Sequence, residues 1–285
     1  MQENSFQCIL FEVATEEPDN DTNYEHVCFG MGQDDEFDIV YHIDDDNGVV
    51  ADRINALDVM HNSGRYKITI TNIIVDTDPV ITTTTQSEVT VEDLGILNSR
   101  KLTAITGDRT MVIFRVSGSD ATSSKTAAQI SDAFFGTSGD INNLKARYAA
   151  CSFGKLQIIP GTGDGFTNGV AEITIDTNVI DSENFAIQDA VTEAIIAKYG
   201  SSLHTKYDHI VYALPRGTTF GKGGHNRWLA YAIMNSYLSV YNGDNVMFIS
   251  NLVHETGHNF GLTHSNHGNQ KYGDQSGIMG SGYGK

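Results

Sequence analysis

The sequence predicts an α/β domain preceded by a smaller β-rich region, and three observations support this prediction. Stretches rich in β-branched residues dominate residues 1–105. From Thr110 onward, apolar runs that read as strands alternate with segments that have the 3.6-residue period of amphipathic helices. A histidine-rich stretch then falls on the last of these helical patterns, close to the C-terminus. We therefore expect two domains, at residues 1–105 and 106–285.

The composition is that of an acidic globular protein. Of the 285 residues, 40% are hydrophobic and 19% are charged, which is enough apolar material for a sizeable core. The net charge of −18 argues against nucleic acid or an anionic membrane as a partner, because both require a basic face. No apolar run approaches the length of about 18 residues that suggests a membrane span, and no signal peptide is visible.

The first region contains four stretches that we interpret as strands, at residues 6–14, 36–42, 66–75 and 80–91. Between them lies an acidic turn, residues 44–48, whose Asp, Asn and Gly content is compatible with calcium. It lacks the spacing and the closing glutamate of an EF-hand loop, so we interpret it as a solvated turn. A calcium ion is therefore unsupported by a specific motif.

The second region follows a polar, comparatively basic connector at residues 98–110, where a processing protease would find an exposed site. A glycine-rich loop at residues 161–169 lacks the spacing of a phosphate-binding loop, and no helix follows it directly. The predicted strands are 111–116, 155–159, 170–176, 209–214 and 228–234, with 236–241 pairing to the last of them, and the predicted helices are 126–135, 141–150, 184–199 and 246–260.

Residues 254–264 read His-Glu-Thr-Gly-His-Asn-Phe-Gly-Leu-Thr-His. On a helix, positions i and i+4 share one face, so His254 and His258 can direct imidazole nitrogens at one ion. Gly261 can adopt the positive φ that ends a helix, which allows His264 to turn back toward that ion. Three protein ligands leave a fourth position for water, which is the arrangement of a catalytic zinc rather than a structural one.

Glu255 follows the first histidine and points away from the ligand face. Its carboxylate is therefore placed to act as a general base toward a water on the ion. His267 is a rival third ligand, but His264 fits the turn at Gly261 better. The other histidines have no ligand spacing among themselves, so we expect one catalytic zinc ion.

Three stretches carry a resemblance to a known family: HETGHNFGLTHSN (254–266), YGDQSGIMG (272–280) and AAQISDAFFGTSGDINNLKARYAACSFGKLQI (127–158). The chain resembles the metzincin zinc endopeptidases and, more narrowly, the gametolysin family, known from green algae as enzymes that dissolve cell-wall glycoprotein. The resemblance implies a metzincin-like catalytic domain with a mixed sheet and an active-site helix. It also implies an extracellular or cell-wall location, and a protein or glycoprotein substrate bound as an extended peptide.

The resemblance also assigns roles to residues near the C-terminus. Met279 would be the Met-turn residue, an apolar base beneath the zinc histidines, and Asp274 lies close enough in sequence to support it. Tyr283 would be an extra zinc ligand or an oxyanion donor. Metzincins continue into a further helix after this turn, so the resemblance implies a chain truncated after the Met-turn. The segment at residues 228–241, just before the active-site helix, is the expected edge for an extended peptide.

The cysteines leave several interpretations open. Metzincin zymogens often block the zinc with a cysteine thiolate, so Cys28 is the candidate zymogen cysteine and residues 1–105 are a candidate propeptide. Cys28 could instead be a partly buried cysteine or form a disulfide with Cys8. Cys151 is expected in the core. The alternative function is a non-catalytic, zinc-containing extracellular or adhesion protein with a vestigial protease domain, which the presence of Glu255 disfavours.

Overall fold

The chain forms two compact units. One unit comprises Met1–Val13 and Tyr24–Thr103, and the other comprises Ala14–Asn23 and Ala104–Lys285. Whether the first unit is a propeptide stays a prediction. The computed structural model describes residues 5–16, 24–31, 37–44, 66–71, 74–75, 80–83, 86–93, 105–220, 226–265, 274 and 277–280.

Every element described in the first unit is a strand, and the strand order is β7-β4-β1-β2-β3-β6-β5. The stretch predicted as one strand at residues 66–75 divides into β4 and β5, and that at residues 80–91 divides into β6 and β7. A continuous β-branched run does not reveal where one strand gives way to the next, because the same residues suit both. The strands are β1 (Ser5–Glu16), β2 (Tyr24–Met31), β3 (Phe37–Asp44), β4 (Tyr66–Thr71), β5 (Ile74–Val75), β6 (Val80–Thr82) and β7 (Glu88–Asp93).

The second unit contains a mixed sheet built around β8. One edge of β8 pairs in parallel with β11, and its other edge pairs in parallel first with β9 and then with β10. β11 pairs in parallel with β13. β12 also pairs with β13, which confirms the predicted pairing, and the two strands are antiparallel. The strands are β8 (Gly107–Ser117), β9 (Leu156–Pro160), β10 (Val170–Thr174), β11 (His209–Leu214), β12 (Ala230–Ile233) and β13 (Leu238–Asn242).

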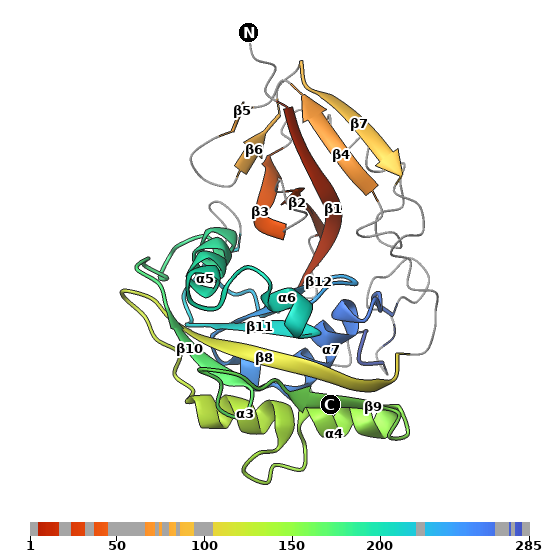
Figure 1. Ribbon diagram of the computed structural model, residues 1–285, viewed down its shortest axis with the longest axis vertical. Helices are drawn as coiled ribbons and strands as arrows, with labels where there is room; N and C mark the ends of the chain where they lie inside the picture. The colour runs from red at the N-terminus through yellow and green to blue at the C-terminus, as the bar shows by residue number, and fades with distance from the viewer. Residues whose placement is uncertain are drawn as a thin grey trace. The chain divides into compact units, whose positions relative to one another are not determined.

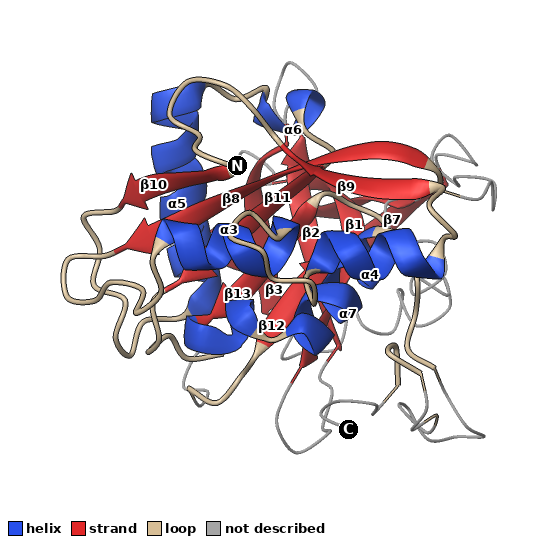
Figure 2. Ribbon diagram, turned by 90° about the horizontal axis from the view of Figure 1, so that it is seen from below, coloured by secondary structure: helices blue, strands red, loops and turns tan. Residues whose placement is uncertain are grey.

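Helices cover both faces of this sheet. α5 and α6 lie on one face, whereas α3, α4 and α7 lie on the other (Figures 1 and 2). The helix predicted at residues 246–260 is shorter in the structure, because a 3₁₀ turn (Gly243–Met247) precedes it. None of the helices in the described ranges is long and apolar enough to cross a membrane. The helices are α3 (Ala127–Phe135), α4 (Leu144–Cys151), α5 (Asn184–Tyr199), α6 (Leu203–Lys206) and α7 (Ile249–Asn259).

The core lies on both faces of β8 and β11, which explains their continuous apolar sequences. Met111 and Ile113 of β8 pack in the cluster beneath α3 and α4, and this cluster also includes Leu252 of α7. Phe114 places its ring 5.5 Å from that of Tyr199 and 6.3 Å from that of Tyr212. The sheet thus anchors α7 through apolar contacts.

The expectation that Cys151 lies in the core is wrong. Cys151 occupies the last turn of α4 and is exposed. The residues of α4 that face the core are Leu144, which is fully buried, and Tyr148, which packs against the core. The end of the short helix therefore reaches solvent.

Asp208 joins the start of β11 to β8, and this contact generates a prediction about pH. Its Oδ2 accepts hydrogen bonds of 2.9 Å from both the backbone N–H and the hydroxyl of Thr110, and its Oδ1 accepts one of 3.1 Å from Arg109. Partial burial opposes ionisation of Asp208, but the hydrogen bonds from Thr110 and Arg109 outweigh it and lower the pKa of the carboxyl.

We expect Asp208→Asn to lower the free energy of unfolding by about 1–2 kcal/mol at neutral pH, since it removes charged hydrogen bonds. A depressed pKa stabilises the fold above the unfolded-state pKa, and that stabilisation is lost as the pH falls through the folded-state pKa. The difference from wild type should therefore shrink in acid. Urea denaturation of both proteins at neutral and acidic pH measures it, and a difference that does not change with pH would contradict this account.

Candidate metal centre

Helix α7 carries the histidine motif and is held in place from two directions. Leu252 is fully buried in the core beneath the sheet. From α4, the Tyr148 hydroxyl donates a 2.8 Å hydrogen bond to the carbonyl of Val253, one residue before His254. At the end of the helix, the Phe260 ring packs edge-on against that of Tyr148 at a centroid distance of 5.3 Å. The helix therefore has a fixed height and rotation relative to the sheet.

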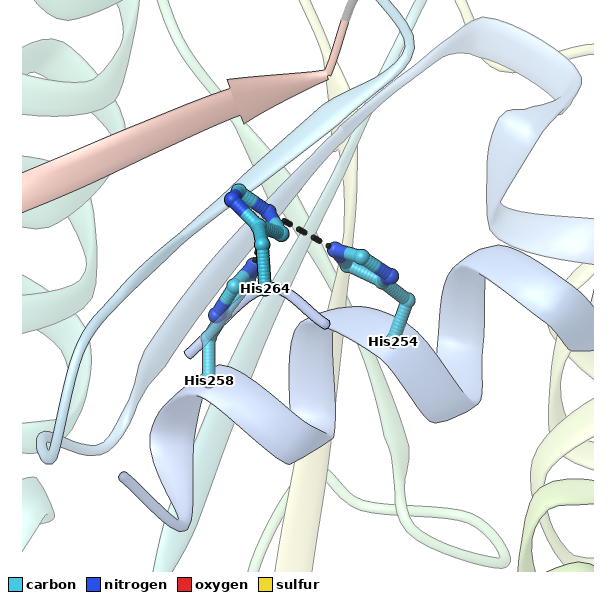
Figure 3. A group of neighbouring side chains, drawn as sticks. All are labelled: His254, His258 and His264. Carbon is cyan, nitrogen blue, oxygen red and sulfur yellow. Dashed lines mark hydrogen bonds between the residues drawn. The ribbon is translucent and has the colours of Figure 1, made fainter. Parts of the chain in front are cut away.

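Three histidine side chains converge at one point beside this helix (Figure 3). His254 and His258 extend from α7, and His264 comes from the segment that follows it. The Nε2 atom of His264 lies 3.1 Å from Nε2 of His258 and 3.2 Å from Nε2 of His254. The relative exposure of the three side chains is 0%, 0% and 5%, so water does not surround them. The structure thus brings together the three residues that the spacing predicted.

The turn at Gly261 delivers His264 to the other two histidines. Gly261 has φ +84°, a left-handed conformation that favours glycine. Its N–H donates to the carbonyl of His258 at 2.8 Å, and the N–H of Leu262 donates to the carbonyl of Gly257 at 2.9 Å. This pair of bonds is a Schellman motif, which satisfies carbonyls at the helix end and reverses the chain. The predicted role of Gly261 is confirmed.

The second nitrogen of two rings sets the tautomer that each ring adopts when it is neutral. His254 Nδ1 lies 2.7 Å from the carbonyl oxygen of Ile278, and His258 Nδ1 lies 2.8 Å from that of Leu262. A carbonyl oxygen only accepts, so each Nδ1 must donate, and each neutral ring then presents a lone pair at Nε2.

These lone pairs explain why the cluster fits a metal ion. With Nδ1 of His254 and His258 directed at carbonyls, Nε2 of both rings is left to face Nε2 of His264 at 3.2 Å and 3.1 Å. Three imidazole nitrogens that meet at one point are a donor set for a single cation. Backbone carbonyls that hold Nδ1 are also the usual outer partners of metal-binding histidines.

Met279 lies directly against the helix at Gly257, between the first two histidines. A Cβ atom at Gly257 would come within 2.6 Å of the Met279 Sδ, so this position of the motif has no room for a side chain. The Met279 side chain is buried, with 6% exposure. Its carbonyl accepts a 2.6 Å hydrogen bond from the N–H of Ser265, the residue after His264. The methionine and the third histidine are therefore joined through adjacent backbone.

Asp274 closes the turn that contains Met279. Its backbone N–H donates to the carbonyl of Ser265 at 3.1 Å, and its Oδ1 accepts from the N–H of Gly277 at 3.3 Å. A Cβ at Gly280 would collide with the Asp274 carbonyl oxygen, so the backbone crosses closely here. The support that the sequence suggested for Asp274 thus acts on the turn.

Glu255 is fully buried on α7, and Tyr241 of β13 is fully buried as well. Burial raises the pKa of the Tyr241 phenol far above its ordinary value, and the negative charge of Glu255 raises it further. The phenol therefore stays protonated near the Glu255 carboxylate at any physiological pH.

Other predicted residues fall outside the described part of the structure. Tyr283 and His267 lie outside the described residues, and for Cys28 only the backbone, in β2, is described. Gly257 and Asn259 are site residues that the sequence reasoning missed. Both residues lie inside the histidine motif, on a helix whose residues are mostly buried, and this position could have identified them as site residues.

Comparison with protein families matches residues 109–284 to the model of the gametolysin peptidase M11 family. No curated protein and no solved structure matches the chain. The family match covers more than half of the chain, including the whole histidine cluster, the Gly261 turn and Met279. The chain therefore belongs to the gametolysin peptidase M11 family and is a peptidase.

Proposed function

We propose that the protein is a zinc-dependent endopeptidase that hydrolyses peptide bonds of extracellular or cell-wall proteins. The observation that carries this proposal is the convergence of three buried Nε2 atoms, two of them on rings whose Nδ1 atoms donate to backbone carbonyls. The family match supplies the reaction class.

Zinc is the ion that this donor set suits best. Imidazole nitrogen is a preferred zinc ligand, and catalytic zinc sites combine three protein ligands with one open position. Among the residues that the structure describes, the metal-binding group comprises only His254, His258 and His264. When bound, zinc would lower the pKa of a coordinated water toward neutrality and polarise the scissile carbonyl.

Glu255 moves the proton in the proposed reaction. Its carboxylate accepts a proton from the attacking water as the water oxygen bonds to the carbonyl carbon. When the C–N bond breaks, the same carboxyl gives that proton to the leaving amine. Tyr241, which remains neutral, adds no charge that would compete with the Glu255 carboxylate.

The substrate would bind as an extended peptide along β12, by addition of a strand to the sheet. One feature supports this choice. The loop that follows β12 contacts the metal helix, where the Asn235 N–H donates to the His258 carbonyl at 2.9 Å. The resemblance to the gametolysins makes cell-wall glycoprotein the proposed substrate class and an extracellular location the corresponding site of action.

Residues 1–105 would be the propeptide of this enzyme, with Cys28 as the thiolate that blocks the zinc before activation. Tyr283 would contribute an oxyanion donor or an extra ligand. Mass spectrometry of the N-terminus of the active protein tests the propeptide proposal. A mature chain that begins near residue 106 supports it, whereas active enzyme that retains residues 1–105 contradicts it.

Glu255→Gln should keep about one zinc ion per chain while lowering the rate of protein hydrolysis by about 10²–10⁴-fold, because only the general base is lost. Metal analysis and a labelled-casein assay measure the two quantities. Glu193→Gln, an exposed change of the same kind on α5, should leave both unchanged. Full activity in the Glu255 variant would refute this mechanism.

Gly257→Ala should weaken zinc binding by about 10–100-fold, the usual effect of disturbing groups that orient metal ligands. The new methyl group would meet the Met279 sulfur and push the helix or the methionine away. Competition with a chelator measures the affinity. In a double-mutant cycle with Met279→Ala, the effect of Gly257→Ala should become smaller, and strictly additive effects would contradict the contact.

A further inference from the structure

Two buried asparagines that the proposed mechanism does not use hold the hairpin formed by β12 and β13. Asn259 donates from Nδ2 to the carbonyls of Ile233, at 3.1 Å, and Leu238, at 2.8 Å. Asn242 donates from Nδ2 to the carbonyls of Trp228, at 3.0 Å, and Asn226, at 3.4 Å. The exposure of the two asparagines is only 1% and 3%. They make the same kind of contact at opposite ends of one hairpin.

Only one of these asparagines joins the hairpin to the metal helix. Asn259 is the last residue of α7 and follows His258 directly, and its two acceptors are the last residue of β12 and the first residue of β13. The Asn235 N–H adds a third bond, to the His258 carbonyl. Asn242, by contrast, belongs to β13 and binds the segment before β12. These two contacts do not reach α7.

The amide of Asn259 therefore sets the distance between β12 and the histidine cluster. Both hydrogens of its planar Nδ2 group are directed at fixed backbone carbonyls, and burial keeps water from replacing them. A peptide paired with β12 would advance about 3.3 Å per residue, so a displacement of the strand by a fraction of that step moves the scissile bond relative to the metal. Misplacement of about 1 Å can cost about 10²-fold in rate.

We infer that Asn259 is a positioning residue that fixes strand β12 at the height where a bound peptide presents its scissile bond to the metal centre. This inference rests on the proposed function. On this inference, the Asn259 side chain determines which bond of a long peptide is cleaved.

The test compares Asn259→Ala with the matched control Asn242→Ala in the zinc-loaded protein. Two quenched-fluorescent peptides with the same central sequence are used, a decapeptide that can pair along β12 and a tetrapeptide that makes far less of this pairing. Asn259→Ala should lower kcat/KM for the decapeptide at least about tenfold more than for the tetrapeptide, with cleavage at additional positions. Asn242→Ala should change both substrates by the same factor and keep the cleavage position.

Equal losses on both peptides with Asn259→Ala, or the same length dependence with Asn242→Ala, would overturn the inference. If Asn259→Ala does not fold, Asn259→Gln keeps both amide hydrogens on a longer side chain and should shift the cleavage position with zinc content unchanged. An unshifted position in that variant would also overturn it.

If the wild-type protein cleaves neither peptide, the proposed function fails, and amide hydrogen exchange still tests the link itself. Loss of Asn259 should speed exchange both in β12 and in the last turn of α7, whereas loss of Asn242 should speed it in the hairpin alone. Unchanged exchange in the Asn259 variant would show that the side chain does not hold the strand.

Discussion

The structure of the site depends on three buried imidazole nitrogens that face one another. The carbonyls of Ile278 and Leu262 lie within hydrogen-bond distance of Nδ1 of His254 and His258, respectively, which turns Nε2 of both rings toward His264. Imidazole nitrogens that converge on one buried point form a donor set for a cation, which is why we interpret the cluster as a metal centre.

The surrounding elements serve to fix this cluster. Tyr148 and Leu252 tie α7 to the α4 face of the sheet, the Gly261 turn returns the chain to the cluster, and Met279 packs where Gly257 leaves room. Asn259 adds the connection to β12 and β13. Most of these links end on backbone carbonyls of elements that also form the core. The proposed peptide site and the proposed metal site therefore share one frame.

Features with a local cause could be predicted from the sequence. The helical period gave α5, the apolar run gave β11, and the motif spacing gave the histidine cluster and the Gly261 turn. Hydrogen bonds from side chains to distant backbone carbonyls could not be predicted. Every residue has a carbonyl, and nothing in the sequence shows which one accepts from Asn259 or Tyr148. Gly257 and Met279 belong to two short motifs that are separated in the sequence, so their contact could not be predicted from either motif. The prediction that Cys151 is buried was wrong because the hydrophobic character of a residue does not show where a short helix leaves the core.

The most direct test of the central claim is zinc-edge X-ray absorption, with metal analysis, on the wild-type protein and on His264→Ala. The account predicts about one zinc per wild-type chain, with a shell that includes three imidazole nitrogens at about 2.0–2.1 Å. His264→Ala should lose one of these nitrogens or lose the metal altogether. A wild-type protein that binds no zinc, or a zinc shell that is identical in His264→Ala, would contradict it.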